Sequence, residues 1–454
     1  MSTNISRRKV VAGAAWAAPV VAASAAVPAF ASSTVCEWES TAAYSANGNT
    51  SGAKGTTSFV VPDLVDKIKF EVVGGAGGTN YDDIAAGSGA KVTGIIEVKP
   101  GQTVQLIGAA GGIGIDPLTP AEGGEGYGNG GSSNLPTPIP ATVMQRVNAI
   151  WPDNSSLKRI IYSASGGGSS ALVINGTPVA VAGGGGGAGF VNSGGANNNP
   201  KYAAAGAVDA GRLWPDKAKR NVYPVIGSTG GSADGAAGSA GNQGALTYAA
   251  DTSVTTTVNA GEGGSAGIGG NGGSKTALHT GKSPNGVLGF YSTNNQEIYQ
   301  SSKSGNQGGD GFKGNGGDGV ASYSSLIDNN DRTKKEEGTH NGSGYALEYK
   351  SIGYNFNGYE SVISAGGGAG YGGGGSGAST SSSAIVLTQK WNNNPNGIRQ
   401  NVSFGQLGGG GGAGGSYVAP GVSGGTITSA GNAPTKRGER GNGYVKVTLC
   451  KRTA

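Results

Sequence analysis

The sequence predicts an all-β protein: a β-sandwich-like framework with a projecting polyglycine II helix bundle and long loop insertions. Two observations predict this class. Of the 454 residues, 92 are glycine, and many stand in runs that recur far apart in the chain. Short segments with alternating apolar and polar side chains lead into several of these runs. Because glycine loses the most backbone freedom on folding, an ordered run needs hydrogen-bond partners, and the other runs can supply them.

Three runs with similar flanks define the expected bundle: Val179–Phe190 (VAVAGGGGGAGF), Ile363–Tyr371 (ISAGGGAGY) and Phe404–Val418 (FGQLGGGGGAGGSYV). In an extended threefold helix with a rise of about 3.1 Å per residue, amides and carbonyls point sideways, and chains without Cβ atoms can bond laterally. A flexible linker is the alternative interpretation, which the apolar flanks disfavour. The expected core of the bundle comprises Gly183, Gly184, Gly185, Gly186, Gly187, Gly366, Gly367, Gly368, Gly408, Gly409 and Gly410.

The first 31 residues have the composition of an export signal. Arg7 and Arg8 precede an apolar run over 10–27, and Ala29-Phe30-Ala31 fits a small-x-small cleavage site. The paired arginines resemble a twin-arginine signal. A membrane anchor is the alternative, which Pro19 and the alanine content disfavour. We therefore expect a secreted protein, extracellular or associated with the cell surface, with a single mature domain over 32–454 and no transmembrane segment after cleavage.

The remaining composition limits the classes of partner. Only 13% of residues are charged, while 17 tyrosines and 5 tryptophans favour an ordered chain. Loss of the leader removes three positive charges from a formal charge of +5. The mature chain is thus close to neutral, and we expect no nucleic-acid partner.

The expected strands follow from alternation and from turn residues. In Lys67–Gly74, Ile68 and the apolar residues two and four positions later share one face, and lysine and glutamate occupy the other. Lys99–Gln102 (KPGQ) fits a type II turn and predicts a hairpin between its flanking strands. Asn175-Gly176 predicts a second hairpin. The expected strands are Thr34–Ser40, Ser58–Val61, Lys67–Gly74, Val92–Val98, Thr103–Ile107, Ala171–Ile174, Thr177–Val181 and Tyr444–Cys450, the last of which is expected to close the sheet.

The two cysteines lie in strand-like segments at opposite ends of the chain. An exported protein favours disulfides, so we expect Cys36 and Cys450 to join the first strand to the last. Two free thiols, or a bridge to another subunit, are the alternatives.

The order of these segments resembles the glycine-rich domain family of the anaplastic lymphoma kinase and leukocyte tyrosine kinase receptors and of secreted bacterial proteins. The matching residues are Phe59–Pro62, Ile68–Gly78, Val92–Gly112, Val179–Gly189 and Gly441–Val445. The resemblance implies a β-sandwich carrying a polyglycine bundle. It is interrupted by insertions rich in Asn, Ser and Tyr: Leu135–Tyr162, Val191–Ser228, Thr276–Asn306, Ala321–Ser364 and Ser379–Gln406.

Motifs of catalysis and metal binding lack their structural context. Gly263–Gly267 (GGSAG) fits GxSxG, but neither a strand before it nor a helix after it is expected. The acidic and amide residues of Gly308–Gly319 lack the regular spacing of calcium-binding repeats. We therefore expect a non-enzymatic protein without a cofactor or a metal.

The expected function is adhesion or ligand binding through the inserted loops, because Tyr and Trp among Asn and Ser supply stacking surface and adaptable hydrogen bonds. The expected partners are a surface glycan, a protein receptor, or copies of itself. The alternative is a structural protein that self-assembles into an extracellular filament or surface coat. The candidate binding residues are Trp151, Trp214, Tyr223, Tyr291, Tyr354, Tyr359 and Trp391.

Overall fold

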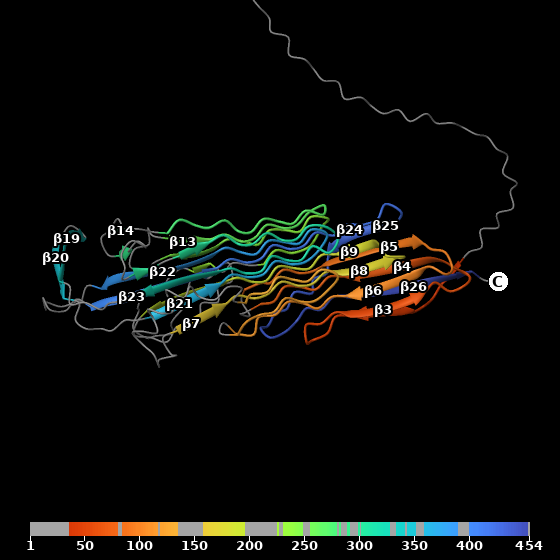
Figure 1. Ribbon diagram of the computed structural model, residues 1–454, viewed down its shortest axis with the longest axis horizontal. Helices are drawn as coiled ribbons and strands as arrows, with labels where there is room; N and C mark the ends of the chain where they lie inside the picture. The colour runs from red at the N-terminus through yellow and green to blue at the C-terminus, as the bar shows by residue number, and fades with distance from the viewer. Residues whose placement is uncertain are drawn as a thin grey trace, which may run out of the picture.

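The computed structural model describes residues 36–79, 84–116, 119–134, 158–195, 225–226, 230–247, 255–278, 281–282, 288–290, 298–299, 301–326, 333–340, 343–350, 358–388 and 399–452. Within these ranges the protein is all-β, with several sheets and no helix. The molecule is elongated, with a β-sandwich at one end, further sheets at the other, and glycine-rich tracts running between them along the long axis (Figure 1). The leader, residues 1–31, lies outside the described residues.

The sandwich lies at the end of the molecule that holds the C-terminus. It consists of two sheets, each built from strands that are far apart in the sequence. The clasp sheet has the order β1-β26-β4-β5-β25, with β2 also paired to β26, and the facing sheet has the order β24-β9-β8-β6-β3. These strands are β1 Cys36–Trp38, β2 Tyr44–Asn47, β3 Gly55–Val60, β4 Val65–Val73, β5 Ala90–Glu97, β6 Thr103–Gly108, β8 Ser170–Ile174, β9 Thr177–Ala182, β24 Tyr417–Val418, β25 Ser423–Ser429 and β26 Tyr444–Arg452.

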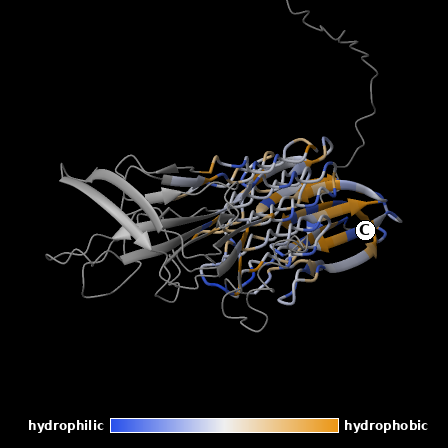
Figure 2. Cartoon of the chain, turned by 60° about the vertical axis from the view of Figure 1, so that its left-hand side comes forward, coloured by the Kyte–Doolittle hydropathy of each residue, from blue (hydrophilic) through white to orange (hydrophobic). Residues whose placement is uncertain are grey.

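Alternating strands form the sandwich core. In β4, Ile68, Phe70 and Val72 are buried, whereas Lys69 between them is exposed, as predicted. Val445 and the next two alternate residues of β26 are buried beside them. Among the residues coloured in Figure 2, the most hydrophobic gather on the strands of this end. This is the largest apolar cluster of the described residues and holds the two sheets together.

The two predicted turns have different outcomes. Asn175 and Gly176 both have positive φ (49° and 81°), and β8 and β9 form the expected antiparallel hairpin. At Lys99–Gln102 the turn is also present, since the Gln102 N–H donates to the Lys99 carbonyl (3.2 Å) and Gly101 has φ 85°. The predicted hairpin there is wrong. β5 pairs within the clasp sheet and β6 within the facing sheet, so this turn carries the chain across the sandwich.

The disulfide prediction is confirmed. Cys36 and Cys450 are bonded, with their Cα atoms 5.3 Å apart. β1 and β26 pair antiparallel, with Trp38 opposite Cys450. β1 ends at Trp38, before the predicted Ser40, and Thr34 and Val35 lie outside the described residues. β26 lies inside the sheet, between β1 and β4, rather than closing it.

The glycine tracts bond to one another laterally, and their partners repeat every three residues. In 183–188, the N–H groups of Gly184 and Gly187 donate to Ala369 and Gly366 (2.7 and 3.0 Å). The N–H groups of the next residues, 185 and 188, donate to Gly75 and Gly78, and their carbonyls accept from 167 and 164. The carbonyls of 184 and 187 accept from 414 and 411. The three sequence-defined runs therefore meet in space, as predicted.

Serine hydroxyls complete this network where no carbonyl is available. The Ser416 hydroxyl accepts the N–H of Gly183 (3.0 Å), and Ser376 does the same for Asn306 (2.8 Å). Both serines are buried. A hydroxyl can thus replace a backbone carbonyl as the acceptor of a buried amide.

The opposite end contains strands where the sequence predicts long loops. Parts of all five insertions form paired strands, so their description as loops is wrong for the described residues. Some of these strands pair with remote segments, as β10 does with β23, and others form local hairpins, as β19 does with β20. The strands are β7 Lys158–Tyr162, β10 Phe190–Gly195, β11 Val225–Ile226, β12 Gly244–Thr247, β13 Thr255–Val258, β14 Gly281–Lys282, β15 Leu288–Phe290, β16 Ile298–Tyr299, β17 Ser301–Lys303, β18 Ala321–Leu326, β19 Thr333–His340, β20 Ser343–Lys350, β21 Gly358–Ile363, β22 Ser379–Thr388 and β23 Arg399–Gly408.

Candidate functional site

Only one of the candidate binding residues falls in the described chain. Tyr359 lies in β21, opposite Ser325 of β18 and Lys158 of β7. β21 is an interior strand of its four-stranded sheet, so placing Tyr359 on a displayed loop is wrong. The other candidates lie outside the described residues: Trp151, Trp214, Tyr223, Tyr291, Tyr354 and Trp391.

A cluster of four aromatic side chains lies where the glycine tracts meet the facing sheet. This junction cluster consists of Tyr127, Phe312, Tyr371 and Tyr417, all half-buried. The Phe312 ring stacks on Tyr371 with centroids 4.6 Å apart and meets the edge of Tyr417 at 4.9 Å. Tyr127, Phe312 and Tyr417 also pack on apolar side chains of β8 and β9. The cluster therefore covers the outer side of this sheet and keeps part of its aromatic surface accessible.

Tight glycine turns bring the cluster together. Gly311 and Gly372, next to Phe312 and Tyr371, have φ near +80°, which favours glycine. The Lys313 ammonium lies 5.0 Å from the centre of the Tyr127 ring, within cation–π range. Burial raises the pKa of the Tyr127 phenol. Chemically the cluster offers stacking surface beside a cation.

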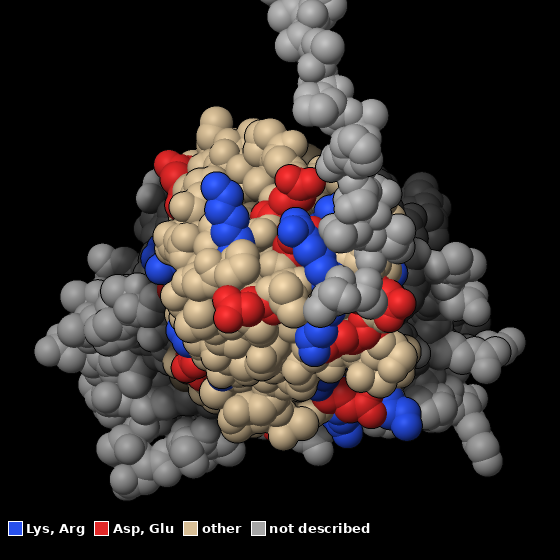
Figure 3. All heavy atoms as spheres, turned by 90° about the vertical axis from the view of Figure 1, so that its right-hand side faces the viewer, with Lys and Arg blue, Asp and Glu red and all other residues tan. Residues whose placement is uncertain are grey.

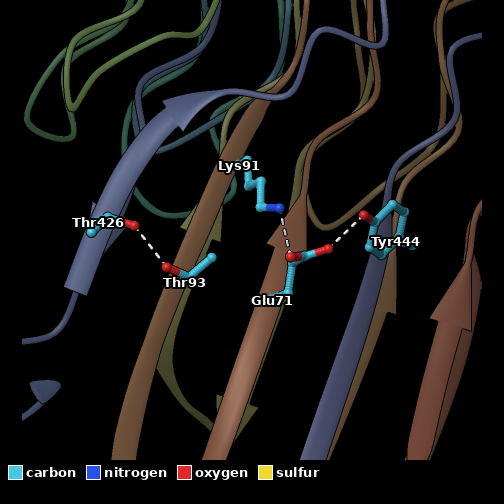
Figure 4. Close-up of polar contacts among 5 residues, drawn as sticks. All are labelled: Glu71, Lys91, Thr93, Thr426 and Tyr444. Atoms are coloured by element: carbon cyan, nitrogen blue, oxygen red, sulfur yellow. Dashed lines mark hydrogen bonds and ion pairs between the residues drawn. The ribbon is translucent and has the colours of Figure 1, made fainter. Parts of the chain in front are cut away.

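A polar network lies on the outer face of the clasp sheet (Figure 4). Glu71 of β4 accepts a hydrogen bond from the Tyr444 hydroxyl (2.6 Å) and pairs with the Lys91 ammonium (2.7 Å). Beside it the Thr93 and Thr426 hydroxyls are 2.7 Å apart. These contacts join strands β25, β5, β4 and β26 in one row.

The network shifts two pKa values in opposite directions. Burial alone raises the pKa of Glu71, but the hydrogen bonds from Lys91 and Tyr444 and the charges of Lys91 and Lys446 outweigh burial and lower it. Burial, followed by the hydrogen bond to Glu71 and its negative charge, raises the pKa of Tyr444 to about 12. The Lys446 ammonium also lies 4.4 Å from the centre of the Tyr444 ring. At neutral pH Glu71 is therefore charged and Tyr444 is a neutral donor.

Charges of both signs are interspersed over the sandwich end (Figure 3). Lys451 pairs with Glu39 (2.7 Å) and Arg452 with Asp66 (2.9 Å) on exposed strand ends. Such pairs contribute little to stability and leave no extended field of one sign. The view of this end therefore offers no basic stripe of the kind that binds nucleic acids.

The carboxyl and amide groups of the segment 308–319 bind backbone amides. Asp310 accepts the N–H of Gly269, and Asp318 that of Ser132, both at 2.8 Å. Asn315 accepts the N–H of Asn129 (2.8 Å). Across the described ranges, no group of three or more His, Cys, Asp or Glu side chains is arranged to hold a metal ion. No helix in those ranges is long and apolar enough to cross a membrane.

No protein-family model matches the chain, and no curated protein matches it either. The junction cluster was not predicted as a site. Tyr371 and Tyr417 stand next to glycine runs in the sequence, which is a local signal. Phe312 and Tyr127 come from remote turns, and local sequence carries no sign that they join the cluster.

Proposed function

We propose that the protein is a secreted, non-enzymatic cell-surface protein that displays recognition residues on a polyglycine scaffold for adhesion or ligand binding. The observation that carries this proposal is the glycine bundle between two β-structured ends (Figure 1). A bundle crossed by backbone hydrogen bonds in several directions resists bending. It is therefore suited to hold one end at a distance from the other.

We infer that the tracts are polyglycine II helices. The three-residue repeat of hydrogen-bond directions along 183–188 supports this inference, because a threefold helix turns each successive amide by about 120°. The close approach of the tracts requires glycine, because a Cβ at Gly184 or Gly186 would overlap the carbonyl oxygen of a neighbouring tract. The resemblance to the glycine-rich domain family agrees with this scaffold.

The disulfide and the leader support export. Disulfides persist in oxidising compartments, and the one between Cys36 and Cys450 joins the first described strand to the last. The proposed partner is a surface glycan or a protein receptor. The junction cluster and the aromatic residues of the insertions are the proposed stacking surfaces.

Binding of the purified mature chain, residues 32–454, to intact cells and to immobilised glycans tests the proposal. One variant replaces the hairpin β19–β20, residues 333–350, by a short Gly-Ser turn. A matched control carries Tyr444→Phe in the sandwich. We expect the hairpin variant to bind at least tenfold more weakly and the control to bind like the wild type. If no surface retains the wild-type protein, the display proposal is wrong. If hairpin removal changes nothing, recognition does not take place at β19–β20.

Self-assembly into a filament or coat is the second candidate function. The observation that favours it is strand β25, an edge of the clasp sheet that pairs only with β5 among the described strands. Electron microscopy of native cell-surface material separates the two functions. Ordered filaments of this chain would overturn the adhesin proposal, whereas isolated particles on cells would support it.

A further inference from the structure

Strand β25 forms an edge of the clasp sheet without the usual protection. It pairs only with β5 among the described strands. Its sequence, SGGTITS, contains neither a charged residue nor proline, and all of its residues except the half-buried Ile427 are exposed. Natural edge strands commonly carry lysine, proline or inward charges that block pairing with another chain. Here the protection consists only of the register shift between Ser423 and Thr426.

The free backbone groups of β25 can be assigned from its register. The Ala430 N–H donates to the Gly89 carbonyl on the β5 side (2.9 Å). Because backbone groups alternate sides along a strand, those of Thr428 and Thr426 also face β5. The groups of Ile427 and Ser429 therefore face away from the sheet, whereas Gly425 lies within the register shift.

This edge is complementary to itself. In an antiparallel pair of two β25 strands centred on Ile427, that residue faces its own copy and the two exchange both backbone hydrogen bonds. Gly425 then lies opposite Ser429 of the second copy, whose outward backbone groups are free to bond to it. Thr426 faces Thr428, in line with the Thr93–Thr426 contact already present across β5 and β25 (Figure 4). No like charges meet anywhere along the pair.

We propose that β25 is a homodimer interface, in which two copies of the chain pair edge to edge about a twofold axis at Ile427. The pairing joins the two clasp sheets into one continuous sheet. It also covers the exposed part of Ile427, whose other side packs on the sandwich core. A second copy is the proposed occupant because the uncharged, symmetric edge fits itself without selecting a charged peptide. This inference does not depend on the proposed function.

Two double variants of the full mature chain test the interface. Thr426→Glu with Thr428→Glu places carboxylates opposite each other across the twofold axis. Thr426→Lys with Thr428→Glu places a lysine opposite each glutamate. Both variants carry Glu at 428, opposite Lys91 of β5, so the contact of residue 428 within the monomer is the same in both. Sedimentation over a wide concentration range gives the dimer dissociation constant, and thermal melting checks the fold.

We expect the wild type to form a dimer. The dimer dissociation constant of the Glu/Glu variant should be at least tenfold higher. That of the Lys/Glu variant should lie within a few fold of wild type and should rise with salt concentration. Hydrogen exchange of the wild type provides an independent readout. The amides of Ile427 and Ser429 should exchange more slowly in concentrated than in dilute protein. A wild type that stays monomeric at millimolar concentration, equal association of both variants, or unchanged exchange at these amides would overturn the proposal.

Discussion

Gly185 shows how closely the tracts approach one another. A Cβ at this position would overlap the carbonyl oxygen of Gly87. We expect Gly185→Val to destabilise the protein by about 3 kcal/mol or more, because neighbouring tracts must separate and leave amides without partners. Gly235→Val is the matched control, since the nearest atom to its added Cβ is 3.7 Å away. Thermal melting of both variants checks this, and a Gly185→Val protein that melts within a degree or two of wild type would contradict the bundle.

Ser416 allows a smaller test of the same network. Its hydroxyl is the acceptor for the buried N–H of Gly183. Ser416→Ala should cost about 1–3 kcal/mol, because the amide loses its partner without gaining water. Ser265→Ala, at an exposed turn, should be close to neutral. Chemical denaturation measures both, and equal stabilities would show that the hydroxyl is dispensable.

At the scale of a strand, the contact between β26 and β4 predicts a pH dependence. The pKa of Tyr444 is raised from 10.0 to about 12 in the folded protein. A raised pKa contributes stability that is fully present below pH 10 and is lost as the pH rises through about 12. Tyr444→Phe should therefore lose less stability than wild type between pH 10 and 12. Melting temperatures across this window measure the difference, and parallel curves would refute the assignment.

Turns illustrate how far local sequence determines the elements. Asn175-Gly176 specifies both the turn and the hairpin, because positive φ at two successive residues matches the twist of adjacent strands. Pro100-Gly101 specifies only a reversal of the chain. Whether the next strand joins the same sheet depends on where its apolar face can be buried. β6 belongs to the facing sheet and buries its apolar side chains against the clasp sheet. Some strands of the insertions pair with remote segments, as β10 does with β23. Others are local: β19 pairs with β20, the next strand along the chain, and Asn341-Gly342 between them in the sequence is a hairpin signal that the prediction overlooked.

At the scale of the molecule, the disulfide predicts a large effect on stability. It joins residues separated by 414 positions, for which the chain-entropy relation gives roughly 6 kcal/mol as an upper limit. Cys36→Ser should lower the melting temperature markedly, and reductant should lower that of the wild type but not of the variant. Mass spectrometry of non-reduced peptides checks the pairing. Free thiols or a link between two chains would contradict the intrachain clasp.

The candidate site was less predictable than the fold. The alternating strands and the two cysteines are local signals that led to confirmed elements, and the glycine runs correctly predicted segments that bond laterally to one another. The junction cluster depends on Phe312 and Tyr127 reaching the same sheet from separate tracts, which no local pattern encodes. The aromatic residues of the insertions are predicted as binding residues from their chemistry alone, and Tyr359, the one among the described residues, lies in an interior strand.

The lateral bonding of the tracts has a consequence for how the protein is made. Residues 183–188 bond to chain near 75, near 167 and near 366, and the Ser416 hydroxyl completes the set. None of the amides of 183–188 finds its acceptor within the same tract, so this part of the bundle can order only after the segments near 366 and 416 have been synthesised. Contacts so remote in sequence make folding slow and leave a long period in which unpaired backbone is exposed. A polypeptide that stops before residue 416 would therefore lack a finished bundle, however many glycine runs it already contains.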